Sequence, residues 1–192
     1  GECPYEQGGY FIIDGKEKII VSHERKAENK IYVQSINDEY YSHSVNIKSV
    51  PQGKFKYPKT TEISIKLKDN SLDLRLPGFS KRIPLFIIFR ALGFESDREI
   101  LELIFGNLEN SVNQELMEDL IPTIENSSLV YKQISAIKYL KEFTKGKTVS
   151  EVINILNNEL IPHIGYEFNN KAYFLGLMTQ KLIYNSRELI PN

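Results

Sequence analysis

The chain before Leu76 consists of short strand-like segments, and the clearest of them alternate apolar and polar positions with the period of two that is typical of half-buried β-strands. The first two segments, Tyr10–Ile13 and Glu17–Val21, are short apolar runs that flank the dipeptide Asp14-Gly15. Both residue types in this dipeptide tolerate the positive φ angles of a tight turn. The pattern therefore predicts a β-hairpin that turns at Asp14-Gly15.

Further alternating segments predict a small antiparallel sheet. Strands are expected at Lys30–Ile36, His43–Ile47 and Glu62–Lys68. The strict alternation of the last segment places Ile63, Ile65 and Leu67 on one face. A turn at Asp69-Asn70 should lead into one more strand, with leucines at Leu72, Leu74 and Leu76.

After Pro77-Gly78 the apolar positions recur at helical spacing. Pro84 suits the first turn of a helix over 83–92, and Gly93 suits its C-terminal end. The spacing of a capping box occurs at Ser96…Glu99, Ser111…Gln114 and Thr148…Glu151. Helices are therefore expected near 97–105, 112–121 and 149–160, with others over Tyr131–Phe143, which Gly146 could cap, and Asn170–Leu189. Strands followed by helices predict an α+β fold: N-terminal β-hairpins and a small antiparallel sheet, then a bundle of about six helices.

Three blocks of sequence, in this order along the chain, resemble one family. The first is Gly8-Gly9-Tyr10-Phe11-Ile12-Ile13-Asp14-Gly15, and the second is Ile83-Pro84-Leu85-Phe86-Ile87-Ile88-Phe89-Arg90-Ala91-Leu92-Gly93. The third joins Leu160-Ile161-Pro162-His163-Ile164 to Lys171-Ala172-Tyr173-Phe174-Leu175-Gly176. Together they are similar to segments of the second-largest subunit of multisubunit DNA-directed RNA polymerases.

The resemblance implies a domain organisation and a role. Residues 1–30 would be the end of the region called the protrusion, a β-hairpin, and residues 31–192 would form the lobe domain. The whole assembly would synthesise RNA on a DNA template by nucleotidyl transfer, whereas this part would be non-catalytic and architectural. Its partners would be other polymerase subunits, the DNA template and initiation factors such as a TFIIF-like factor.

A stand-alone protein–protein interaction module that shares the hairpin is the alternative, from a different functional class. The ends of the sequence bear on the choice, because a native module would begin with Met. The chain instead starts at Gly1 and stops at Asn192, which favours a piece of a longer protein.

Composition limits the function classes further. The formal net charge of -1 over 192 residues excludes a strongly basic DNA-wrapping protein. No apolar run reaches the roughly 18 residues of a membrane span, and the single cysteine, Cys3, excludes an intrachain disulfide. Ile, Asn and Lys are abundant, as AT-rich coding would produce, and together with the resemblance this suggests a large DNA virus or an AT-rich eukaryote as the source. The expected location is intracellular: the nucleus or, for a viral protein, the virion and host cytoplasm.

Catalytic and metal-binding motifs do not occur in the sequence. There is no phosphate-binding G-x-x-x-x-G-K-(S/T) loop and no H-E-x-x-H pair. His23, His43 and His163 lie far apart without partners at ligand spacing, so a metal site is not expected. We interpret His163 as a hydrogen-bonded residue at a helix end and Arg90 as a member of a structural salt bridge. No cofactor is expected in this part; the resemblance implies magnesium for the whole enzyme, bound elsewhere.

The densest basic cluster lies in and just after the predicted hairpin, at Lys16, Lys18, His23, Arg25 and Lys26. Such side chains neutralise phosphates, so contact with nucleic acid is one interpretation. A charged hairpin edge that resists pairing with other chains is the other. His23 departs from the family, in which an amide is typical, and any contact through that side chain is in doubt.

Acidic side chains recur at helical spacing in the second half, at Glu99, Glu102, Glu115, Glu118 and Asp119. They could form part of a rim that faces a basic partner protein. Plain solubilising charge on exposed helix faces explains them equally well.

Overall fold

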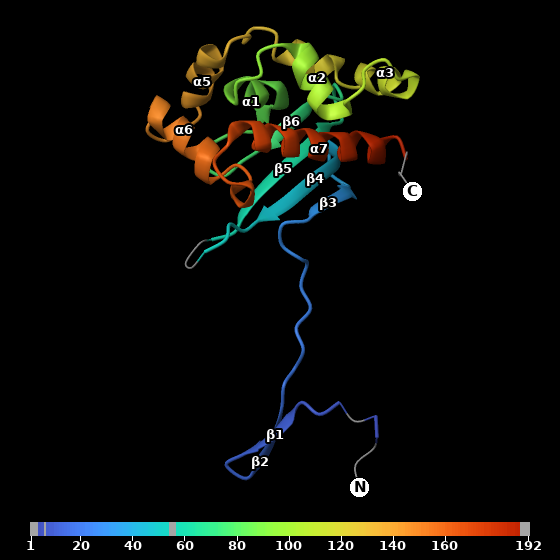
Figure 1. The fold of residues 1–192 in the computed structure, drawn as a ribbon, viewed down its shortest axis with the longest axis vertical. Helices are drawn as coiled ribbons and strands as arrows, with labels where there is room; N and C mark the ends of the chain where they lie inside the picture. The colour runs from blue at the N-terminus through green and yellow to red at the C-terminus, as the bar shows by residue number, and fades with distance from the viewer. Residues whose placement is uncertain (1–3, 6, 54–56, 189–192) are drawn as a thin grey trace.

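The computed structural model describes residues 4–5, 7–53 and 57–188. Within these residues the chain forms two antiparallel sheets and seven α-helices, so the expected α+β class is confirmed. The smaller sheet is a two-stranded hairpin, β1 (Tyr10–Ile13) with β2 (Lys16–Ile19). An extended segment connects it to the rest of the molecule, from which it stands apart in all three views (Figure 1).

The larger sheet has five strands in the order β3-β4-β5-β6-β7. Their bounds are β3 (Ile31–Ser35), β4 (Tyr41–Ser49), β5 (Lys59–Lys66), β6 (Leu72–Arg75) and β7 (Ile83–Pro84). The antiparallel register aligns four residues in one row across the sheet: Val45, Ile63, Leu74 and Ile83. All four are fully buried, so this row begins the hydrophobic core.

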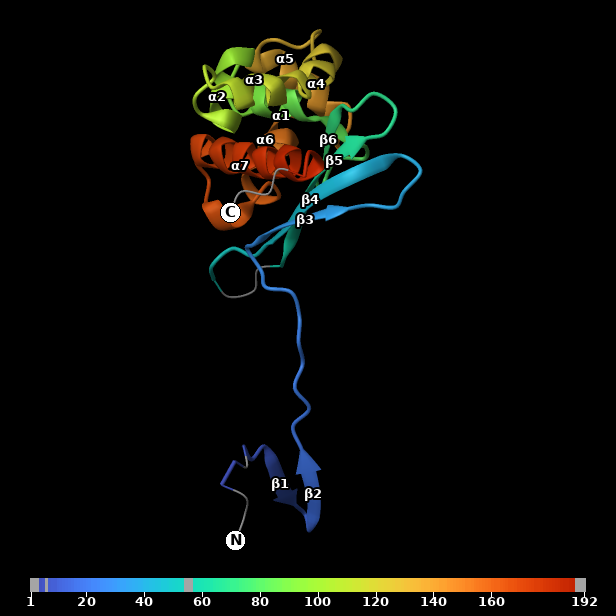
Figure 2. The same cartoon turned by 90° about the vertical axis from the view of Figure 1, so that its right-hand side faces the viewer.

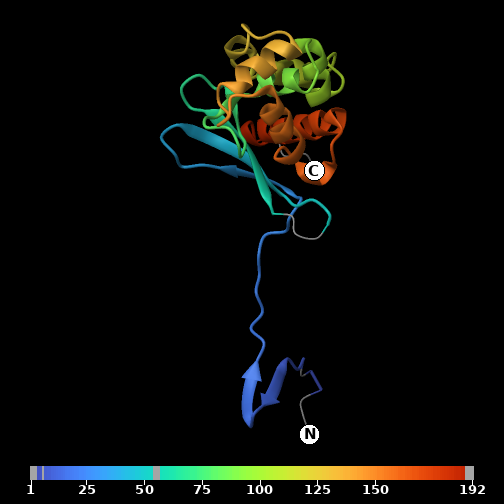
Figure 3. The same ribbon diagram turned by 90° about the vertical axis from the view of Figure 1, so that its left-hand side faces the viewer.

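The helices cover one face of this sheet (Figures 2 and 3). They are α1 (Leu85–Ala91), α2 (Asp97–Phe105), α3 (Ser111–Glu118), α4 (Ile121–Asn126), α5 (Gln133–Lys141), α6 (Val149–Asn158) and α7 (Phe168–Ser186). The longest, α7, packs on β3 and β4 and also against α2. The central helix is α1, whose residues are all buried, including Arg90.

Three expectations about local structure were wrong. Leu67 lies beyond the end of β5 and is half exposed, so it does not share the buried face of Ile63. Ser96 precedes α2 without a side-chain cap, and α3 begins after Asn110, whose side chain accepts from the Val112 amide. Gly146 does not end α5, which stops at Lys141.

Two other boundaries differ from those expected, and at one of them the element type differs as well. The segment expected as one helix over 112–121 is divided between α3 and α4, and Ile83-Pro84 pairs with β6 instead of opening α1. The expected capping box at Thr148 is half formed. Thr148 Oγ1 accepts from the Glu151 amide at 3.2 Å, but the Glu151 carboxylate accepts from the Gly146 amide at 2.7 Å. Leu189, the expected end of the last helix, lies outside the described residues.

Candidate functional site

The hairpin turn presents two of the predicted basic residues. Asp14 and Gly15 have φ angles of 53° and 71°, which confirms the tight turn between the strands. Lys16 and Lys18 are alternate residues of β2 and therefore share one face of the hairpin. Both are exposed, as is every residue of the two strands.

The other three basic residues lie on the extended segment that follows the hairpin. His23, Arg25 and Lys26 are exposed. Arg25 approaches Glu28 at 3.8 Å, and the Lys26 ammonium lies 5.5 Å from the centroid of the Tyr32 ring. The five side chains are thus spread over the hairpin and the extended segment after it, residues 20–30, which we call the arm. They do not form one compact patch.

The five predicted acidic residues divide into three environments. Glu99 and Glu102 are exposed on α2 and line a groove between α2 and α7. Glu115 and Glu118 are exposed on α3. Asp119 accepts from Arg187 at 2.9 and 2.6 Å, and this hydrogen-bonded pairing holds the pKa of the guanidinium above its usual value. Asp119 therefore ties α3 to the end of α7 and is not free to meet a partner in this arrangement.

The two structural interpretations made from sequence are confirmed. Arg90, fully buried, donates to Asp97 at 2.5 Å and also to the backbone carbonyls of Ser127 and Val130. His163 lies in a short 3₁₀ turn, Pro162–Ile164, where its Nδ1 is 2.8 Å from Ser49 Oγ. Burial lowers the pKa of the His163 imidazole below its ordinary value.

The sequence analysis did not single out two residues of α7, one buried and one exposed. Lys171 is fully buried in α7, and its Nζ donates to the carbonyls of Leu156, Asn157 and Leu160 at 2.6–2.7 Å. Tyr173, two positions later, is 64% exposed beside the groove of α2 and α7. Both stand in the third family block, but helical spacing alone gave no reason to separate a buried lysine from an exposed tyrosine.

The described part of the chain has neither a metal-binding cluster nor a membrane-spanning helix. No three His, Cys, Asp or Glu side chains there gather in a way that could hold a metal ion. Among the same residues, no helix has the length and hydropathy needed to cross a membrane.

Comparison with known proteins decides the family. The family model described as RNA polymerase Rpb2, domain 2, matches residues 16–188. The chain belongs to this family. The match runs from β2 to α7. The five-stranded sheet and the seven helices within it give this lobe domain of the polymerase second-largest subunit the α+β architecture described above.

Curated relatives agree with the family model. The chain is 36% identical to DNA-directed RNA polymerase II subunit RPB2 of Encephalitozoon cuniculi, over 95% of this chain and 17% of that protein. It is 30% identical to DNA-directed RNA polymerase II subunit 2 of Arabidopsis thaliana, over 95% and 17%. An archaeal relative, DNA-directed RNA polymerase subunit Rpo2 of Saccharolobus shibatae, is 28% identical over 95% and 16%. The chain thus spans about a sixth of the length of these relatives.

Proposed function

We propose that this chain is the lobe region of the second-largest subunit of a DNA-directed RNA polymerase, contributing to the DNA cleft and to docking of factors and subunits during transcription. The observation that carries the proposal is the match to the Rpb2 domain 2 family over residues 16–188. The assembled enzyme would be the nucleotidyltransferase. Its other subunits and the DNA template would be the partners, within the cell and, for a eukaryotic source, in the nucleus. The reported relatives are eukaryotic and archaeal, so a viral source remains only an expectation.

The lobe itself would take no part in the chemistry. Magnesium-dependent phosphoryl transfer needs clustered oxygen ligands. The described residues offer no such cluster, so they do not fit a magnesium site, and the ion would be bound elsewhere in the enzyme.

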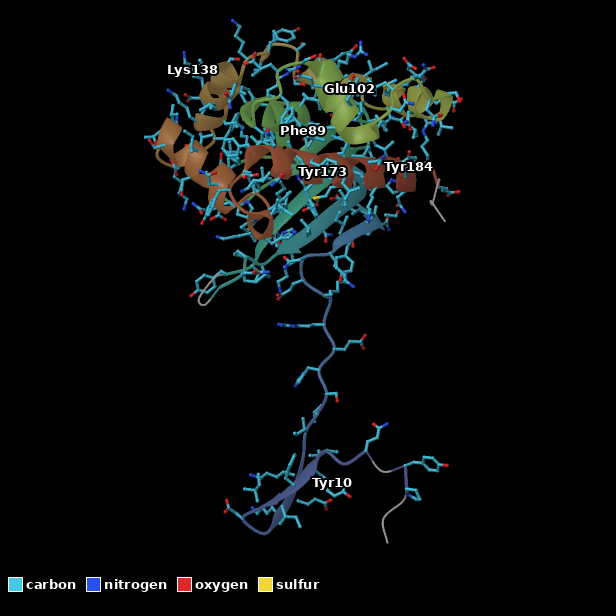
Figure 4. The ribbon with its side chains drawn as sticks, in the orientation of Figure 1. Tyr10, Phe89, Glu102, Lys138, Tyr173 and Tyr184 are labelled. Carbon is cyan, nitrogen blue, oxygen red and sulfur yellow. The ribbon has the colours of Figure 1, made fainter. Side chains whose placement is uncertain are left out.

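We also propose that residues 1–30 belong to the protrusion and residues 31–192 to the lobe. The hairpin supports this division because its apolar side chains are exposed on both faces. They include Tyr10, Phe11, Ile12, Ile13 and Ile19; Figure 4 shows Tyr10 far from the helices. A strand that is apolar on both faces is typical of a buried sheet, so the hairpin would be covered by other parts of the same subunit.

The basic residues of the hairpin and arm would face nucleic acid. Lys16, Lys18, Arg25 and Lys26 carry the charge, and His23 lies between them. With little net charge on the chain, their contribution to binding would be electrostatic, weak and sensitive to salt.

Charge reversal tests the nucleic-acid role. In the assembled polymerase with the full-length subunit, Lys16, Lys18, Arg25 and Lys26 are changed together to Glu. DNA affinity should fall and its dependence on salt concentration should flatten. A matched variant reverses four exposed lysines of the lobe, namely Lys81, Lys138, Lys145 and Lys181. Equal effects of the two variants would contradict a specific role for the hairpin and arm.

The stand-alone interaction module has less support. The family match runs through β2 and the whole larger fold, whereas a borrowed hairpin would leave the sheet and helices unmatched.

A further inference from the structure

The groove between α2 and α7 lies beside a point where the two helices pack closely at a glycine. A Cβ atom at Gly176 would lie 2.8 Å from the backbone carbonyl oxygen of Leu103. The helices therefore approach each other at this point through backbone. The space next to the crossing encloses about 520 Å³ and is open to solvent.

The floor of this groove is apolar. It is lined by buried or half-buried side chains from both helices and from the segment before α2: Phe94, Leu103, Ile104, Phe105 and Leu177. Along α7, Tyr173, Leu177 and Gln180 follow one another at the i, i+4, i+7 spacing of a single helix face. This face extends for about 10 Å, at 1.5 Å per residue, which is roughly two helical turns.

The rim carries an exposed aromatic residue and two carboxylates. Tyr173 is 64% exposed although its neighbours Ala172 and Leu175 are fully buried. Glu99 and Glu102 stand on the α2 side, and Figure 4 shows Glu102 on α2 above Tyr173 on α7. Every charged residue that lines the groove is acidic. The nearest cation on α2, Arg98, is 80% exposed and makes only a surface pair with Glu102 at 2.9 Å, which an incoming lysine could replace.

We infer that this groove binds a short amphipathic helix with basic flanks, presented by a protein that associates with the polymerase. An apolar floor selects apolar side chains at i, i+3 and i+4, and the acidic rim selects Lys or Arg beside them. The two walls are helices, whose backbone groups are already paired. An extended peptide would therefore leave its own backbone without partners there, whereas a helix satisfies it internally. Tyr173 supplies the central aromatic contact.

This inference rests on the proposed function and refines it. Of the five acidic residues on the helices, it assigns the docking role to Glu99 and Glu102. Glu115 and Glu118 lie outside the groove lining, and Asp119 is paired with Arg187. The lobe would thus present one defined groove instead of a diffuse acidic face.

The test uses a phage-displayed library of random 16-residue peptides against the assembled polymerase with the full-length subunit. Counter-selection is against the same enzyme with Tyr173→Ser, Glu99→Lys and Glu102→Lys. The enriched peptides should have apolar residues at helical spacing and Lys or Arg beside them. As synthetic peptides they should bind the wild-type enzyme at least tenfold more tightly than the variant, and more weakly as salt rises.

Three controls keep the result interpretable. Glu115→Lys with Glu118→Lys makes the same charge change outside the groove and should leave peptide affinity unchanged. Tyr173→Trp should retain binding, because it keeps an aromatic side chain. Co-purification of subunits and RNA synthesis should be normal in the groove variant, so a loss of either would mark a failure of assembly instead of docking.

Other outcomes would overturn the inference. They are a selection that yields no peptide dependent on the groove residues, groove-dependent peptides that are acidic or contain helix-breaking proline, and equal loss of affinity in the Glu115/Glu118 control. Each can occur while the subunit still assembles and the enzyme still transcribes, so the proposed function would survive them.

Discussion

The hydroxyl oxygen of Ser49 lies 2.8 Å from Nδ1 of His163 and 3.0 Å from the backbone nitrogen of the same residue. Ser49 is the last residue of β4, and His163 lies in the turn between α6 and α7. One buried hydroxyl thus fastens the edge of the helical layer to the sheet. The His163 ring also packs edge-on against Phe174, with ring centroids 5.2 Å apart, which removes it further from water.

This attachment predicts a stability that falls in mild acid. Burial lowers the pKa of His163 below 6.5 in the folded chain, so the unfolded chain takes up its proton first as the pH drops. The contribution of the neutral, buried His163 imidazole to the free energy of unfolding is complete above about pH 6.5. It is lost as the pH falls from there through the pKa of His163 in the folded chain. Urea unfolding at several pH values should show a flatter pH dependence for His163→Gln than for wild type. His23→Gln, at an exposed position, should not change the slope.

The hydrogen bonds of the Lys171 ammonium group predict that its removal lowers the free energy of unfolding substantially. Its three hydrogen bonds satisfy carbonyls at and just after the end of α6, and two of these, of Leu156 and Leu160, would otherwise be buried without donors. Lys171→Met should lower the free energy of unfolding by about 3 kcal/mol, since each unsatisfied buried group costs about 1–3 kcal/mol. Chemical denaturation measures the difference. Lys181→Met, at an exposed position of the same helix, should stay within about 0.5 kcal/mol of wild type.

The hairpin turn predicts that a substitution at Gly15 destabilises the hairpin without affecting the larger fold. Gly15 has a φ angle of 71°, in a region that β-branched residues resist. Gly15→Val should destabilise the hairpin by roughly 1 kcal/mol or more, while the larger fold remains intact. Amide hydrogen exchange across β1 and β2 would then accelerate, with unchanged protection in β4 and β5. Asp14→Asn is the control, because Asn accepts positive φ, and faster exchange in that variant too would argue against backbone strain as the cause.

The close contact at Gly176 predicts that even one methyl group is too large. Gly176→Ala places Cβ 2.8 Å from the Leu103 carbonyl oxygen, and that backbone atom cannot rotate away. The strain should exceed the gain in helix propensity and lower the free energy of unfolding by about 1–2 kcal/mol. At Gly146 the equivalent Cβ meets only the flexible Glu151 carboxylate. Thermal unfolding of Gly146→Ala should therefore differ less from wild type, and the opposite order would contradict this account.

Local patterns predicted the elements well, because period and turn chemistry are properties of a few neighbouring residues. The hairpin at Asp14-Gly15 and the helix Asp97–Phe105 follow from such patterns. The first residues of helices were harder to predict, because several neighbouring residues can each provide the N-terminal cap. Asn110 immediately precedes Ser111, and its side chain takes the cap that Ser111 was expected to provide.

The candidate site depended on contacts between distant residues, which local patterns do not encode. The ion pair of Asp119 with Arg187 joins positions 68 residues apart and withdraws one carboxylate from the expected rim. The buried position of Lys171 depends on the end of α6 lying against α7. The groove itself lies beside the close approach of Gly176 to Leu103, which becomes visible only once both helices are placed.

The position of α7 also has a consequence for synthesis on the ribosome. This helix covers β3 and β4 and packs against α2, yet it follows all three elements in the sequence and is made after them. While residues 76 to 186 are being translated, the apolar face around Val45 stays without its final cover. At about 5–20 residues per second, that interval lasts on the order of 5 to 20 seconds. We expect such a nascent chain to be bound by chaperones that recognise transiently exposed apolar surface.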